Sequence, residues 1–71
     1  MIMKITKYTW RDDAGNIVLI TRRRRNGLST YVMLICTTSG FEIESDVSSA
    51  VAADALKRMR NQHKKETFYL P

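Results

Sequence analysis

The chain has 71 residues and a formal net charge of +5, with 12 lysines and arginines against 7 aspartates and glutamates. This length allows one small domain with a thin hydrophobic core, which excludes multidomain enzymes. An apolar fraction of 44% and a charged fraction of 27% are typical of a globular protein rather than a disordered one. The single cysteine, Cys36, forms no internal disulfide, and with the one histidine it gives too few ligands for a structural zinc site. We therefore expect no metal and no cofactor.

The chain shows no targeting or membrane signal. Its longest apolar run, residues 31–36, is far shorter than the roughly 20 residues of a membrane helix. The N-terminus does not resemble a signal peptide. We expect a cytoplasmic protein without a membrane partner, folded as one domain over residues 1–71.

The predicted elements begin with four strands, over residues 3–11, 16–25, 28–38 and 41–45. Their β-branched and aromatic residues alternate with turn compositions, of which Asn26-Gly27 is the strongest, because a two-residue hairpin turn needs positive φ at both positions. Residues 47–63, rich in good helix formers, predict an amphipathic helix. The tail, residues 66–71, is apolar enough to dock on the domain. The sequence predicts an α+β fold, a three- to four-stranded antiparallel sheet packed against one C-terminal helix.

Turn lengths predict which side chains share a sheet face. With two-residue turns at Asn26-Gly27 and Ser39-Gly40, and Arg11 closing on Asn16, one apolar set faces the helix as the core: Tyr8, Trp10, Ile17, Leu19, Val32, Leu34, Cys36, Phe41 and Ile43. The opposite face then exposes a strip that monomeric proteins seldom leave uncovered: Val18, Ile20, Met33 and Ile35. This strip is the predicted protein interface, for the tail, a second copy or a foreign protein. A one-residue change of register would exchange the two faces.

Four consecutive arginines precede the hairpin turn, and residues 1–35 carry all of the net positive charge. Arginine suits both phosphate and guanine, and a two-stranded ribbon fits the major groove of B-DNA. We predict that the chain binds nucleic acid, with duplex DNA as the preferred form. The predicted binding residues are Arg22, Arg23, Arg24, Arg25, Lys7 and Tyr31. An acidic protein surface as partner, or a hairpin tip kept soluble by charge, are open alternatives.

A second basic group follows the predicted helix: Lys57, Arg58, Arg60, Lys64 and Lys65. These residues extend the binding track or form a solvated helical face. Nucleophile–base pairs, metal-ligand spacings and phosphate-binding glycine loops are not recognisable in the sequence. We therefore expect no catalytic residues and no enzyme activity.

The run Thr30-Tyr31-Val32-Met33-Leu34-Ile35-Cys36, then Phe41-Glu42-Ile43-Glu44-Ser45 and the helix through Arg60-Asn61-Gln62, resembles the bacterial cell division activator family. This resemblance implies a double-stranded-DNA-binding module of antiparallel strands followed by one helix. The chain also resembles the C-terminal half of double-stranded RNA-binding domains, in which three strands lead to an alanine-rich helix similar to Ala50 to Met59. In style, the chain resembles small phage accessory proteins. The expected function is a small DNA-binding regulator; the alternative is a protein-binding module, such as a phage-type inhibitor or regulator of a host protein, or a homodimer.

Overall fold

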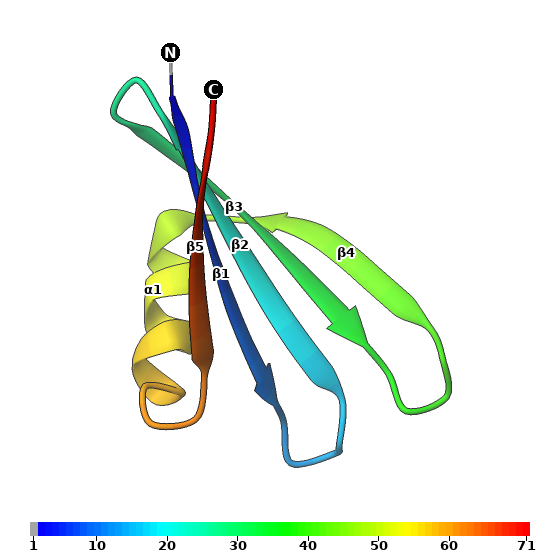
Figure 1. Ribbon diagram of the computed structural model, residues 1–71. Helices are drawn as coiled ribbons and strands as arrows, with labels where there is room; N and C mark the ends of the chain where they lie inside the picture. Colours follow the sequence, from blue (N-terminus) through cyan, green and yellow to red (C-terminus); the bar gives the residue numbers. More distant parts are fainter. Residues whose placement is uncertain (1) are drawn as a thin grey trace.

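The computed structural model describes residues 2–71 as a five-stranded antiparallel sheet with one helix (Figure 1). The strands are β1 (Met3–Arg11), β2 (Ile17–Arg25), β3 (Leu28–Cys36), β4 (Glu42–Val47) and β5 (Lys64–Leu70), and helix α1 is Ser49–Arg58. Their order in the sheet is β4-β3-β2-β1-β5, so the last strand pairs with the first. Within the described part of the chain, no helix has the length and apolar character that crossing a membrane requires.

The α+β class, the antiparallel sheet and the single helix are confirmed, whereas the strand count and the helix position are not exact: the sheet has five strands, and β5 follows the helix. Helix α1 begins after Ser48, whose hydroxyl accepts a hydrogen bond from the Val51 amide at 3.1 Å. It ends at Arg58, because the chain turns after Met59, whose carbonyl accepts the amides of the third and fourth residues beyond it. The predicted tail is the edge strand β5, paired with β1 along its length.

The connections after β1 and after β3 are both three-residue loops. The sequence predicted a four-residue loop after β1 and a two-residue turn after β3, so each prediction is wrong by one residue. After β1, the Asp12 amide donates to the Asn16 carbonyl and the Asn16 amide donates to Asp12 Oδ1, both at 2.9 Å. After β3, the Thr37 amide donates to the Phe41 carbonyl at 2.8 Å, and the Phe41 amide donates to Thr37 Oγ1 at 3.0 Å. Each loop ends in a glycine with positive φ, as this loop class requires: Gly15 at +85° and Gly40 at +93°.

These loops shift two of the three predicted registers by one residue. Arg11 pairs with Ile17 instead of Asn16, and Ile43 pairs with Ile35 instead of Cys36. The hairpin at Asn26-Gly27 is as predicted, with φ of +54° and +77° and pairs from Ile17↔Cys36 to Arg25↔Leu28. The predicted pairing of β2 with β3 is therefore confirmed. In β1 and β4, however, each side chain lies on the same sheet face as the β2 and β3 residues that the prediction had placed on the other face.

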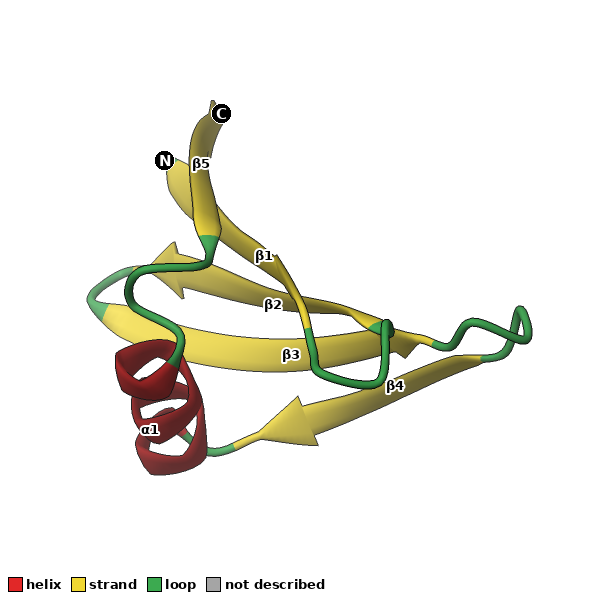
Figure 2. Ribbon diagram, turned by 90° about the horizontal axis from the view of Figure 1, so that it is seen from below, coloured by secondary structure: helices red, strands yellow, loops and turns green. Residues whose placement is uncertain are grey.

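Helix α1 packs on the face that the sequence assigned to a protein partner (Figure 2). The buried hydrophobic residues are Trp10, Val18, Ile20 and Ala52, with Met33 and Ile35 packed against them. The interface prediction for Val18, Ile20, Met33 and Ile35 is therefore wrong: these side chains form the core. The shifted register is the reason, because it sets Trp10 opposite Val18 and Tyr8 opposite Ile20.

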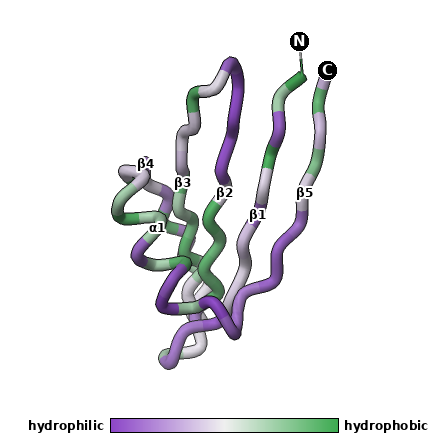
Figure 3. The backbone as a smooth tube through the Cα atoms, turned by 90° about the vertical axis from the view of Figure 1, so that its left-hand side faces the viewer, coloured by the Kyte–Doolittle hydropathy of each residue, from purple (hydrophilic) through white to green (hydrophobic). Residues whose placement is uncertain are grey.

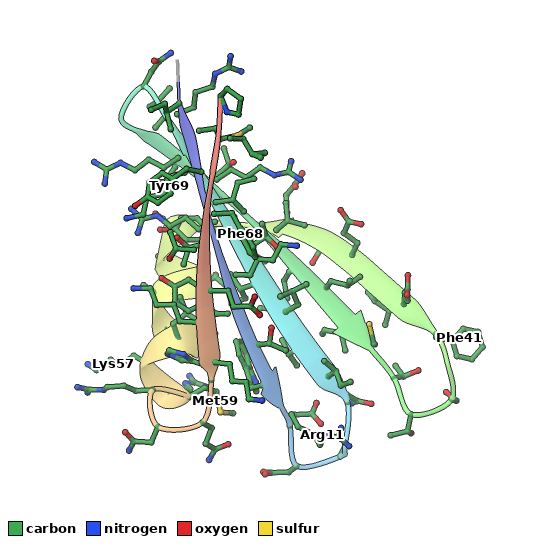
Figure 4. The ribbon with its side chains drawn as sticks, in the orientation of Figure 1. Arg11, Phe41, Lys57, Met59, Phe68 and Tyr69 are labelled. Atoms are coloured by element: carbon green, nitrogen blue, oxygen red, sulfur yellow. The ribbon has the colours of Figure 1, made fainter. Side chains whose placement is uncertain are left out.

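The other side of the sheet, here called the open face, carries five residues that the sequence assigned to the core: Ile17, Leu19, Val32, Leu34 and Cys36. No described element lies over them (Figure 2), and Ile17 is 40% exposed. Two other core predictions also fail. Phe41 projects from the β3–β4 loop, 70% exposed (Figure 4), and Ile43 is 55% exposed at the start of β4, away from α1.

Candidate nucleic-acid interface

The arginine run lies at the end of the sheet where β2 and β3 meet, beside both chain termini (Figure 1). Along β2 the hydropathy changes from apolar to strongly hydrophilic toward this end (Figure 3). Strand alternation places Arg22 and Arg24 on the helix-covered face and Arg23 and Arg25 on the open face. The four guanidinium groups therefore point to both sides of the sheet instead of forming one row.

A fifth basic residue joins them, because Lys4 on β1 pairs with Arg24 on β2. We call this group the arginine end: Lys4, Arg22, Arg23, Arg24 and Arg25. Its surrounding segments, residues 2–6, 22–30 and 67–71, contain no aspartate or glutamate. In residues 2–71 the one ion pair within 4.0 Å is Arg58–Asp54, on α1. No carboxylate of the described chain therefore forms an ion pair with the arginine end, although Asp46 of β4 lines one surface pocket together with Arg23. Lys4 is not among the predicted site residues because it is distant in sequence from the four arginines. The pairing of β1 with β2 is what places it beside them.

Arg22 is held in place by two side chains of β3. Its Nε donates to Ser29 Oγ at 3.3 Å, and its guanidinium carbon lies 5.9 Å from the centre of the Tyr31 ring. Tyr31 is half-buried and packs against the core, so its ring supports Arg22 and is not free to stack on a base. Arg23, Arg24 and Arg25 are exposed.

Lys7, the remaining predicted site residue, borders the arginine end on the open face. It is opposite Thr21 on β2, which makes it the diagonal neighbour of Arg23. On its other side it is opposite Glu66, and its Nζ lies 5.8 Å from the centre of the Phe68 ring. Lys7 thus has a carboxylate directly opposite it on the neighbouring strand.

The second predicted basic group does not form a continuous track, because the helix ends at residue 58. Its members divide among α1, the following turn and β5: Lys57 and Arg58, then Arg60, then Lys64 and Lys65. Lys57 points away from the sheet (Figure 4), and Arg58 pairs with Asp54 at 2.9 Å. Lys64 and Lys65 lie on opposite faces of the edge strand.

The arginine end is wider than an isolated hairpin. Strand β1 pairs with β2 as far as Lys4↔Arg24, and β5 pairs with β1 as far as Met3↔Leu70. Four strands about 4.8 Å apart span roughly 14 Å, whereas the major groove of B-DNA is about 12 Å wide. The ribbon geometry expected from the sequence is therefore replaced by a broad basic edge.

The described residues form no group that suits a metal. Among residues 2–71, no three His, Cys, Asp or Glu side chains come together in a potential metal site. Cys36 is half-buried on the open face. His63 packs edge-on against Tyr8, with ring centres 5.3 Å apart, at the junction between α1 and β5.

No protein-family model matches the chain, and neither a curated protein nor a solved structure is significantly similar to it. The resemblance to cell division activators stays a prediction. In this fold β5 follows the helix, which differs from the C-terminal helix that the resemblance implies.

Proposed function

We propose that the chain is a non-enzymatic module that binds nucleic acid, preferentially duplex DNA, through phosphate contacts of the arginine end. The observation that carries this proposal is the gathering of five basic side chains, none of which has an ion-pair partner within 4.0 Å in the described chain. Guanidinium groups hydrogen-bond phosphate through two parallel N–H groups, which gives both energy and geometry. A small module that binds DNA in this way could act as a regulator.

The arrangement supports binding by charge rather than by reading bases. Arg23, Arg24 and Arg25 are exposed on both sides of the sheet, so they can contact phosphates on either side of its end. Arg22, held by Ser29 and Tyr31, fixes the direction of approach. Neutralising four to five phosphates would release condensed cations and give a slope of about −4 in log affinity against log salt concentration.

The test replaces all four arginines, Arg22 to Arg25, with serine and measures binding to a short fluorescent duplex by anisotropy over a salt series. A matched control replaces Lys57, Arg60, Lys64 and Lys65 with serine. Both variants lower the formal net charge from +5 to +1, since each loses four positive charges. Circular dichroism confirms that each variant is folded.

We expect the arginine variant to lose at least tenfold in affinity and its salt slope to fall by about 3 to 4, since each phosphate contact contributes about 0.9. The control should keep most of the affinity. Equal losses in the two variants would show that binding follows total charge and not the arginine end. If the wild-type chain binds neither DNA nor RNA but binds a polyglutamate peptide, this result would support the alternative that its partner is an acidic protein surface.

A further inference from the structure

The open face combines an uncovered apolar block with a small core on its other side. The block covers the centre of β2 and β3: Ile17, Leu19, Val32, Leu34 and Cys36. Helix α1 packs on the opposite side (Figure 2), where four hydrophobic residues are buried within the described part of the chain. Contiguous apolar surface of this kind marks interaction sites, and a chain of this size gains much from burying a second face.

Charges of opposite sign border the apolar block on its two sides. On β4, three acidic side chains belong to the open face: Glu42, Glu44 and Asp46. On β1, the open face carries Lys7 and Arg11. From β4 to β1, the surface is therefore acidic, then apolar, then basic. Beyond β1, the edge strand β5 adds one charge of each sign to this face, Lys64 and Glu66. None of the five charged side chains that β4 and β1 place on this face has an ion-pair partner within 4.0 Å in the described chain.

This pattern is complementary to itself about one orientation of a two-fold axis. With the axis parallel to the strands and between β2 and β3, β4 of one copy lies over β1 of the other, and β3 lies over β2. With the axis across the strands, acidic β4 would lie over acidic β4, which charge repulsion disfavours. We propose that the chain forms an isologous homodimer in which two open faces pack about the axis parallel to the strands.

The strand registers define which residues meet in this dimer. Glu42, Cys36, Ile17 and Arg11 form one row across the sheet. About the proposed axis, Glu42 lies over the partner's Arg11, and Cys36 lies over the partner's Ile17. In the neighbouring rows, Leu34 lies over the partner's Leu19, and Asp46 lies over the partner's Lys7. Apolar pairs thus occupy the centre, with an ion pair at each rim.

Two geometric points support contacts between copies over contacts within one chain. Strands β4 and β1 are three strand spacings apart, about 14 Å, so Glu42 and Arg11 of one chain would pair only if both lay fully extended across the apolar block, and they form no ion pair. Facing sheets pack about 10 Å apart with their strands nearly aligned, and an acidic and a basic side chain can bridge this gap. The axis also brings the two arginine ends to the same end of the dimer, although the dimer does not depend on their function.

The first test measures mass by sedimentation equilibrium, without nucleic acid, for the wild type and two variants. Leu19→Arg places a charge in the centre of the proposed interface and should give a monomer. Val51→Arg makes the same kind of change at a position of α1 that is 53% exposed, and it should remain a dimer. A wild-type chain that is monomeric at all concentrations would overturn the proposal. The Arg22–Arg25 serine variant should still form the dimer, which separates this proposal from nucleic-acid binding.

The second test exchanges the charges of one rim pair. Arg11→Glu and Glu42→Arg should each weaken the dimer by about tenfold, since each places like charges together in both symmetric pairs. The double variant should recover wild-type dimerisation. Both side chains are exposed, so the variants should fold. A double variant that is as weak as the single ones, or single variants with full dimerisation, would refute this axis and favour another contact, such as pairing of free β5 edges.

Discussion

The two faces of the sheet are both apolar along β2 and β3, yet only one is covered by the helix. Residues 17–20 and 31–36 are apolar at nearly every position, so alternation within the central hairpin does not distinguish the faces. The outer strands make the difference. β1 adds Tyr8 and Trp10 to the covered face and Lys7 and Arg11 to the open face, while β4 adds its three acidic side chains to the open face. The helix therefore covers the side on which the flanking strands extend the apolar surface.

The strongest way to test this comparison is to remove equivalent apolar volume from each face. Ile20 is fully buried under α1, so Ile20→Ala should lower the free energy of unfolding by about 2–5 kcal/mol through lost burial and a residual cavity. Its neighbour Leu19 is half-buried on the open face, so Leu19→Ala should cost less than about 1 kcal/mol in the monomer. Urea unfolding at a concentration where sedimentation shows a monomer measures both effects. Equal costs would mean that the open face is packed in the isolated chain.

Local signals in the sequence predicted the part of the fold that depends on short-range chemistry. Asn26-Gly27 needs positive φ at both positions, and no other short turn fits it as well, so the β2–β3 register is correct. The predicted amphipathic helix does turn one side to the core, through Ala52, Ala55, Leu56 and Met59. Helical spacing also places Val51 on that side, but Val51 is 53% exposed. The lengths of the loops after β1 and β3 were predicted wrongly. Asp12-Asp13-Ala14-Gly15 and Ser39-Gly40 are each compatible with two loop lengths that differ by one residue, and the sequence does not distinguish between them.

The remaining errors arise from pairing between distant segments. Lys64 and Lys65 continue the helical composition, and only the contact with β1 makes them part of a strand. The arginine run was evident from composition, but Lys4 joins it only through the β1–β2 register. The open face and its opposed charges depend on three registers together. A single one-residue shift at either outer strand would have hidden them.

The loops that set these registers offer the next test. Gly15 and Gly40 have φ of +85° and +93°, so replacing either with alanine should cost about 1–2 kcal/mol of stability through backbone strain. A Cβ atom at Gly15 would also lie 3.2 Å from Thr38 Cγ2, whereas one at Gly40 meets nothing within 4 Å. Gly15→Ala should therefore be the more destabilising variant in urea unfolding. If Gly40→Ala were the worse, steric contact at Gly15 would not contribute to the difference.

The smallest expected effect concerns the carboxylate that closes the first of these loops. The Asn16 side-chain amide donates to Asp12 Oδ2 at 3.0 Å and lowers the pKa of Asp12 below its ordinary 3.8; the amides of Asn16, Ala14 and Gly15 act in the same direction, against the effect of burial. A depressed pKa in the folded state adds stability above pH 3.8 that is lost as the pH falls through the folded-state value.

Asp12→Asn should therefore flatten the dependence of the urea midpoint on pH in the acidic range, while Asp13→Asn, whose carboxylate accepts none of these hydrogen bonds, should leave it steep. The same slope in Asp12→Asn and the wild type would show that the carboxylate does not hold the loop. The β1–β2 register, and with it the choice of covered face, would then depend on Gly15 and on the packing of Trp10 against Val18.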